Sequence, residues 1–390
     1  MHKNFADWKY IPLLAISIAE ITAMEQLPDK DRDMILPLFP LKGWASAHKL
    51  SSSIKKIREA TGSRPWIADI DTKFLYSNKT FLFTGSFPER PVFHELEKLL
   101  DPYNAFNNWY EFIKDHEEAI PCLRLENLED LEDLEDLEDL EDLEDLRKQA
   151  TKLCSLARGL VIRINPTPEN YERQELIFKS LDAEVLERTL VIYDLGQIDA
   201  KFGERINTLI SFITSARAYT SSLEIAVSAS SFPYGFAGQQ QGENSIYERM
   251  LYNQVSERAD LKPIIYSDRG STRADKQDGG AGTPPPRIDY PLKKDWKFVR
   301  REVDDDAPNA QERRRAAYIE IAKEITSNTY WIPELRLWGT QQIEITAEGS
   351  EFGISSPMRS TAVRINIHLF NQLHYDMETS EIDTDEEWTD

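Results

Sequence analysis

The chain has 390 residues, of which 41% are hydrophobic and 10% aromatic, and its formal net charge is −22. This length fits one large domain with an appended segment or two domains, and the composition is that of a globular protein. No apolar run approaches the roughly 20 residues that a membrane helix needs, so the sequence argues against a membrane protein.

Eight short apolar runs follow one another through the first two thirds of the chain, and helix-like stretches separate most of them. The runs cover residues 11–18, 35–41, 65–70, 119–125, 159–164, 189–195, 223–229 and 262–266. Eight strands alternating with helices are typical of a (β/α)8 barrel, in which functional groups lie where the strands end. We therefore predict an α/β fold with a (β/α)8 TIM-like barrel over residues 1–269.

A Leu-Glu-Asp repeat follows the fourth run and carries most of the negative charge. Residues 126–145 contain 13 acidic side chains and the tail 376–390 contains eight, which together supply 21 of the 22 excess negative charges. On an α-helix a three-residue repeat rotates successive leucines by about 60°, so no single apolar face forms. We predict an acidic low-complexity insertion over 126–146 that forms a projecting, solvated, partly frayed helix joined to a helix over 147–157, and an acidic disordered tail. A docking arm is the alternative for the repeat.

The region after the eighth run changes in composition. Residues 270–286 are rich in Gly and Pro and predict a flexible linker. We expect an α+β segment over 287–375 that packs on the barrel, with strands at 296–301, 343–345 and 364–368 and a helix at 309–326. Its basic residues 287–315 are a solvated face or a phosphate-binding patch, and nucleic acid is not expected as a partner elsewhere. The loop 233–244 is either an ordinary mobile loop or a lid.

Cysteine and histidine usage points away from metal and redox chemistry. Cys122 and Cys154 lie in a predicted strand and a predicted helix, which is typical of a reduced, cytoplasmic protein. The six histidines show no metal-binding spacing, and neither a dinucleotide fingerprint nor a serine-nucleophile motif is present. We expect no metal site and no cofactor.

Charged residues inside or just after the apolar runs are the candidate site. Arg163 lies within the fifth run and Asp194 within the sixth, and a buried charge persists only when it is paired or functional. The two therefore form either a structural ion pair or part of one site. The other candidates at run ends are Glu20, Lys42, Asp69, Glu248, Asp268 and Arg269. For each of them a helix cap or a core salt bridge is the alternative.

An ordered set of short motifs resembles one known family. The motifs include Tyr-Ile-Pro-Leu-Leu at 10–14 leading to Glu20, Val-Ile-Arg-Ile at 161–164, Asp-Leu-Gly at 194–196, Ser-Phe-Pro at 231–233, and Arg359 followed by His368. Their order resembles the beta family, named for a phage beta protein and found in phages, prophages and bacterial mobile regions. The resemblance runs over roughly residues 9–375 outside the repeat and the linker. It implies a barrel-like fold and a mobile-element or phage-conflict setting, and it assigns no reaction.

The chain departs from the family pattern at its first strand. Where the family has lysines before a Gly-Glu pair, this chain has Ala15 and Ser17 before Ala19-Glu20. The stretch Ser-Asp-Arg at 267–269 replaces a Gly-Asp-Tyr-like sequence, and Gly339 precedes Thr rather than Asp. If the lysines act in catalysis in relatives, this chain has kept the scaffold and lost or changed the activity.

Two classes of function remain open. The first is an enzyme or ligand sensor for an anionic nucleotide or phosphorylated small molecule at the barrel mouth. In this class Arg163 and Arg269 bind charge with Lys42, Asp69 and Glu248 as further ligand contacts, and Asp194, Asp268 or Glu20 transfers protons. The second is a non-catalytic protein-interaction component of a phage-defence or prophage system, with a degenerate barrel site and a protein partner.

Overall fold

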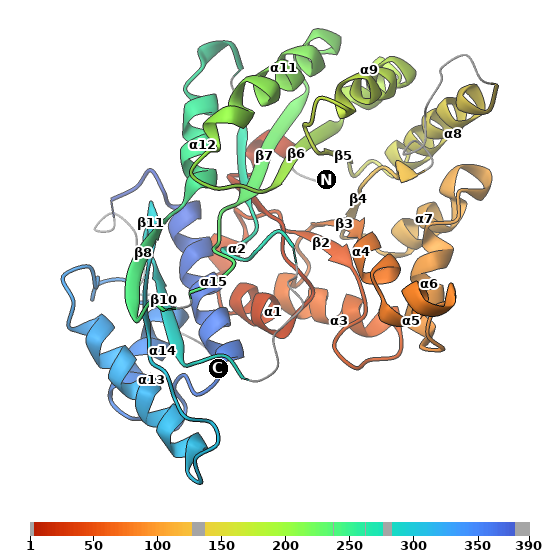
Figure 1. Ribbon diagram of the computed structural model, residues 1–390. Coiled ribbons are helices and arrows are strands. Elements are labelled where there is room, and N and C mark those ends of the chain that lie inside the picture. Colours follow the sequence, from red (N-terminus) through yellow and green to blue (C-terminus); the bar gives the residue numbers. More distant parts are fainter. Residues whose placement is uncertain (1–3, 127–136, 237, 262, 276–282, 379–390) are drawn as a thin grey trace.

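Eight parallel strands form the centre of the described part of the molecule, with helices around them (Figure 1). The computed structural model describes residues 4–126, 137–236, 238–261, 263–275 and 283–378. Parts of the predicted insertion (127–136), linker (276–282) and tail (379–390) lie outside the described residues.

The parallel strands are divided between two sheets. The larger sheet contains, in spatial order, β1 (Tyr10–Pro12), β9 (Ile265–Asp268), β7 (Glu224–Ser230), β6 (Thr189–Gln197) and β5 (Leu160–Ile164). The smaller sheet contains β2 (Leu38–Leu41), β3 (Trp66–Ile70) and β4 (Ala119–Pro121). The predicted α/β class with parallel strands is confirmed, and the strands are assigned to two sheets without a closed barrel.

Isolated parallel β-bridges connect the edge strands of the two sheets. Leu13, just after β1, is bridged to Leu38 of β2, and Cys122, just after β4, is bridged to Val161 of β5. The backbone N–H of Leu14 donates to the carbonyl of Leu38 at 2.8 Å, and that of Leu123 donates to Val161 at 2.8 Å. The edge strands of the two sheets are therefore neighbours at both edges.

Both faces of the parallel strands are buried, which explains why they read as nearly continuous apolar runs. Alternate residues of a strand point to opposite faces. In β6, Leu190 and Ile192 belong to one apolar cluster, which we call the smaller apolar cluster, whereas Val191 and Tyr193 belong to a second, larger one. The first cluster contains side chains from or beside all eight parallel strands.

The helices lie between and beyond these strands in the chain. Those of the first two thirds are α1 (Ile18–Glu25), α2 (Asp29–Arg32), α3 (Leu50–Thr61), α4 (Thr72–Tyr76), α5 (Lys79–Thr84), α6 (Pro91–Leu99), α7 (Tyr103–Asp115), α8 (Leu137–Cys154), α9 (Asn170–Ser180), α10 (Ala183–Leu186), α11 (Gly203–Tyr219) and α12 (Tyr247–Ser256). Among the described residues, 3₁₀ turns cover Phe5–Asp7 and Ala259–Leu261. Residues 147–154 of the helix expected over 147–157 belong to α8, which ends at Cys154. No helix among the described residues has the length and hydropathy to cross a membrane.

The C-terminal segment builds a third, antiparallel sheet. Its strands are β10 (Arg287–Pro291), β11 (Asp295–Arg300) and β8 (Gln241–Ser245), in that order. Strand β8 comes from the region 233–244, which was expected to be a loop, and it pairs with β11 rather than with the parallel strands. Residues on both sides of the predicted linker therefore share one sheet.

Three helices complete this segment, α13 (Ala310–Thr326), α14 (Trp338–Ala347) and α15 (Pro357–Leu373). The strand at 296–301 and the helix at 309–326 are confirmed, but the strands expected at 343–345 and 364–368 are wrong because both stretches are helical. The alternating isoleucines there resemble a strand. In α15 every residue from Ala362 to Leu373 is buried, so no polar face marks the helical period.

Helix α15 contacts two helices that are distant from each other in the sequence, α1 and α14. It lies against α1, and its Asn366 side chain donates to the carbonyl of Ala23 at 3.0 Å. The same side chain accepts from the backbone N–H of Gly339 in α14 at 3.0 Å. Asn366 is fully buried and connects three helices.

We expect Gly339→Ala to lower the free energy of unfolding by about 1–3 kcal/mol, because a well-packed core resists an added methyl group. A Cβ at Gly339 would lie 2.7 Å from Ile367 and 2.9 Å from the carbonyl of Val363. Gly203→Ala in the first turn of α11 is the matched control, since a Cβ there meets nothing within 4 Å. Urea denaturation measures both, and equal stabilities for the two variants would contradict this packing.

Candidate functional site

A cleft of about 2000 Å³ opens at the carboxyl ends of the parallel strands. Its lining includes residues at the ends of β2, β3, β5, β6 and β9, together with residues of β10, α13 and α15. The carboxyl ends of parallel strands are where ligands bind in most α/β folds. The C-terminal segment supplies the remaining wall.

An alternating series of charged side chains crosses the strand ends in this cleft, and we call it the strand-end ion chain. Its members, in order of contact, are Arg124, Asp69, Arg163, Asp194 and Arg269. Asp69 accepts from Arg124 Nη2 at 2.5 Å and from Arg163 Nη1 at 2.7 Å. Asp194 accepts from Arg163 Nη2 at 2.6 Å and from Arg269 Nη2 at 2.5 Å. The predicted Arg163–Asp194 pair therefore exists and forms part of a longer series.

The strand period explains how distant residues meet there. Asp69 comes two residues after Ile67, and Asp194 two residues after Ile192, so each shares a strand face with a member of the smaller apolar cluster. The three arginines of the ion chain follow members of the same cluster at even spacings, namely Cys122, Val161 and Ile265. The charged side chains of the ion chain therefore lie on the same strand faces as the smaller apolar cluster, closer to the carboxyl ends of the strands.

The arginines keep both buried carboxylates ionised. Burial alone would raise the pKa of Asp194, but the charges of Arg269 and Arg163 and the backbone N–H of Gly196 lower it to about 2. Burial is likewise outweighed at Asp69, whose pKa Arg124 and Arg163 hold below its usual value. A carboxylate with so low a pKa is a weak proton acceptor at neutral pH. Asp194 is therefore better suited to hold the two arginines than to transfer a proton.

Within the ion chain, Arg163 is the member most open to the cleft. Its side chain is 28% exposed, whereas the side chains of Asp69 and Asp194 are each 6% exposed. Nε and both terminal nitrogens of Arg163 donate to these two carboxylates, which fixes the plane of the guanidinium. The geometry presents a fixed, partly exposed cation to the cleft.

Asp268 lies in a separate, fully buried network. Its carboxylate accepts from Tyr266 Oη at 2.8 Å, from the backbone N–H of Gly270 at 2.8 Å and from the hydroxyl of Tyr10. His368 Nε2 of α15 lies 2.7 Å from it. Although burial would raise the pKa of Asp268, His368 lowers it. This network attaches α15 to the strand ends.

Glu248 is also buried, at the start of α12. Its carboxylate accepts a hydrogen bond from Ser231, whose hydroxyl oxygen also accepts from the backbone N–H of Tyr247 at 2.9 Å. Burial, reinforced by the negative charge of Asp268, raises the pKa of Glu248 to about 8. Neither Asp268 nor Glu248 is among the described residues that line the cleft.

The remaining predicted residues do line the cleft. Glu20 projects from α1 and accepts a hydrogen bond from Ser17. Lys42 follows β2, and its Nζ lies 3.9 Å from Asp71. The cleft therefore contains six of the eight residues expected from the sequence, which are Glu20, Lys42, Asp69, Arg163, Asp194 and Arg269.

Two parts of the cleft were not predicted. Arg124 lies inside the fourth apolar run and shows the same signal as Arg163, a charge embedded among buried residues. It is not among the candidate site residues named from the sequence. A second group on the C-terminal wall contains Arg273 and Arg364, which no pattern in the sequence indicated, and Arg287, which belongs to the basic residues 287–315. The three come from separate segments, and no local pattern connects them.

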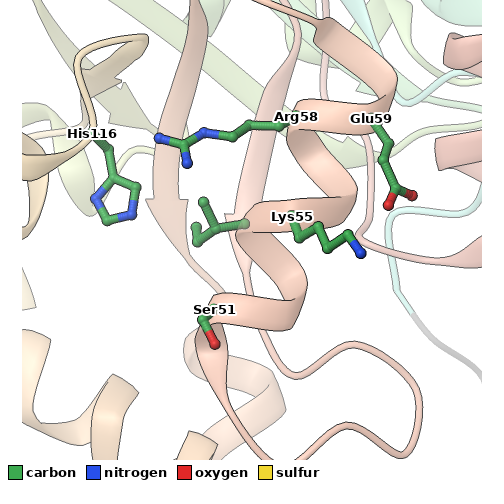
Figure 2. A pocket seen from close by; sticks show the side chains of 6 residues that line it. Ser51, Lys55, Arg58, Glu59 and His116 are labelled. Atoms are coloured by element: carbon green, nitrogen blue, oxygen red, sulfur yellow. The ribbon is translucent and has the colours of Figure 1, made fainter.

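A smaller hollow of about 400 Å³ lies on α3, away from the strand-end residues. Figure 2 shows Arg58 of this helix directed toward His116, with Lys55 and Glu59 nearby. Arg58 also pairs with Glu118 at 3.4 Å. None of the predicted site residues lines this hollow. Within the described ranges no group of three His, Cys, Asp or Glu side chains is placed to hold a metal ion.

Comparison with known proteins gives one consistent result. A family model described as "Beta protein" matches residues 10–374. The chain is also 28% identical over 378 residues to "Protein beta" of Enterobacteria phage P4, an alignment that covers 96% of this chain and 95% of that protein.

We expect Asp194→Asn to lower the free energy of unfolding at neutral pH by about 3 kcal/mol, because it leaves two arginines without their shared carboxylate. The lowered pKa of Asp194 means that its stabilisation is present above about pH 4, the unfolded value, and is lost as the pH falls toward about 2. The difference between wild type and variant should therefore shrink on acidification. Urea denaturation at several pH values measures it, with Asp260→Asn at the exposed Arg258 pair as control.

Glu248→Gln should stabilise the protein in mild alkali. Because the folded-state pKa of about 8 lies above that of an unfolded glutamate, the contribution of Glu248 to stability is fully present below about pH 4 and is lost as the pH rises through about 8. Gln cannot ionise, so the variant should exceed wild type at about pH 8.5 and differ less at about pH 5. Thermal melts with the exposed Glu257→Gln as control test this, and a pH-independent difference would refute it.

Proposed function

The chain belongs to the beta protein family, and we propose that it binds an anionic small molecule of the nucleotide or phosphorylated class in the strand-end cleft. The charge of the cleft carries this proposal. Among the described residues that line it, eleven are Lys or Arg and seven are Asp or Glu, whereas the whole chain carries a net charge of −22. A positively charged concave surface on an acidic protein concentrates anions.

We also propose that the two parallel sheets continue into one another as an eight-stranded (β/α)8 ring. Two observations support this proposal. The bridges Leu13–Leu38 and Cys122–Val161 connect the sheet edges on both sides, and one apolar cluster takes side chains from or beside all eight strands. Such a cluster is the expected filling of a barrel interior. A function at the mouth of this ring is then an inference by analogy with other proteins of the same fold.

In this proposal the strand-end ion chain positions the ligand. Arg163, fixed by Asp69 and Asp194 and partly exposed, binds an anionic or strongly polar group, and Arg269 supports it. Glu20 lines the cleft and is the proposed proton-transfer group if the ligand reacts. Asp194 serves as a positioning residue because Arg269 and Arg163 keep it ionised.

Exposed apolar side chains favour a second candidate function, a protein-interaction role in a phage or prophage defence setting. On α5, Phe83 is 92% exposed and Leu82 is 69% exposed, and Tyr76 of α4 is 45% exposed. Large apolar side chains grouped on a surface are typical of protein contacts. The phage origin of the relative supports the setting. Binding in the cleft and contact through α5 are compatible.

The proposed ligand can be sought without knowing its identity. Mass spectrometry of small molecules released from the purified full chain should find an anionic compound that is enriched over a purification control. Arg163→Gln should deplete this compound at least about tenfold, since a charge-assisted contact contributes about 1.5–3 kcal/mol.

Arg163→Lys, which keeps the charge, and the exposed Arg258→Gln serve as matched variants. Thermal melts confirm that each variant is folded. A wild-type sample free of enriched anionic compounds would contradict the proposed function. Equal retention by Arg163→Gln would contradict the role of Arg163.

A further inference from the structure

We infer that Arg273, Arg287 and Arg364 form a phosphate-binding subsite on the C-terminal wall of the cleft, which we call the arginine subsite. This inference rests on the proposed function and specifies which part of the cleft holds the phosphate group of the ligand. All three side chains line the cleft. They come from the segment after β9, from β10 and from α15.

Two of the arginines are held in one rigid arrangement. Arg287 Nε lies 3.1 Å from the carboxylate of Asp289, and Arg364 Nη1 lies 2.9 Å from the same carboxylate. The guanidinium of Arg287 stacks over the ring of Phe236 at 3.8 Å, and that of Arg364 over the ring of Phe232 at 3.9 Å. The faces of both guanidinium groups are thereby covered, and cation–π contacts and ion pairs fix their positions.

Arg273 joins this arrangement through the same loop. Its Nε donates to the carbonyl of Pro233 at 2.9 Å, directly after Phe232. Among the described ion pairs of the three arginines, Asp289 is the one carboxylate partner. Glu20 is a further negative charge that acts on Arg364, so the three arginines exceed the carboxylates Asp289 and Glu20 by one positive charge.

The unbalanced charge has an electrostatic cost in the absence of an anion. Burial and then the charge of Arg287 lower the pKa of Arg273. Burial also lowers the pKa of Arg364 to about 10, and Arg287 adds to this effect although Asp289 and Glu20 oppose it. Arg364 is 4% exposed, and its Nε has no hydrogen-bond partner in the described structure. A bound anion would offset the repulsion between the arginines.

The strand-end ion chain differs from the arginine subsite in its charge balance. Its three arginines are matched by Asp69 and Asp194, and Glu126 lies 3.5 Å from Arg124. The charges of the ion chain are therefore nearly balanced, and Arg163 acts there as a fixed charged donor to the ligand rather than as part of an excess of positive charge. The arginine subsite is therefore the part of the cleft with the stronger demand for negative charge.

The chemistry of the subsite favours a phosphate dianion. A phosphate monoester offers three acceptor oxygens and up to two negative charges to the three guanidinium groups, whereas a carboxylate offers two oxygens and one charge. An aromatic base is disfavoured as occupant because guanidinium groups already cover Phe232 and Phe236. The first turns of α15 line the same wall through Pro357, Ser360 and Thr361, and the partial positive charge of a helix N-terminus adds to the attraction.

Calorimetric titration of the full chain with inorganic phosphate at constant ionic strength tests the subsite. Wild type should bind phosphate, and Arg273→Gln should weaken its affinity at least about tenfold. Binding should also tighten from about pH 5.5 to about pH 8 as phosphate becomes a dianion, because its second pKa is about 6. Arg287→Gln is a second variant, and the exposed Arg258→Gln is the matched control.

Each outcome decides the inference. Loss of affinity in both Arg273→Gln and Arg287→Gln, with wild-type melting behaviour and an unchanged Arg258→Gln control, supports the subsite. Equal phosphate affinity in either folded variant, or no binding to wild type, overturns it. The small-molecule profile of the same samples separates the two proposals. An anionic compound that still copurifies with wild type leaves the proposed function standing while the subsite fails.

Discussion

The pairing of two buried carboxylates with three arginines is the interaction on which the cleft depends. Asp69 and Asp194 come from adjacent regions of two different sheets, and Arg163 of β5 contacts both. Removing two carboxylates from water is costly, and only close, well-oriented cations offset that cost. The ion chain thereby connects the carboxyl end of the smaller sheet to that of the larger one. Its side chains form part of the lining of the cleft.

The fold was predictable where one local pattern was enough. Runs such as 159–164 and 189–195 are strands because both of their faces are buried, and their Val and Ile residues suit that environment. The same logic failed at 364–368, where a fully buried helix also lacks a polar face. Strand β8 could not be foreseen, because residues 241–245 carry no strand pattern and are ordered by pairing with β11.

The site was predictable to the extent that single residues were conspicuous. A charge inside an apolar run identified Arg163 and Asp194, and the structure brings them together. Asp268 and Glu248 gave a similar signal, yet they lie in buried networks with Tyr10, His368 and Ser231. The arginine subsite depends on the meeting of three distant segments, which composition and spacing do not record.

Helix α15 has a consequence for the order in which the molecule is made. Its residues Asn366 and His368 contact Ala23 and Asp268, which leave the ribosome much earlier. A nascent chain that ends after β9 therefore holds Asp268 without its histidine partner and α1 without the helix that packs against it. The first 269 residues must persist in an incomplete state until α15 has been synthesised.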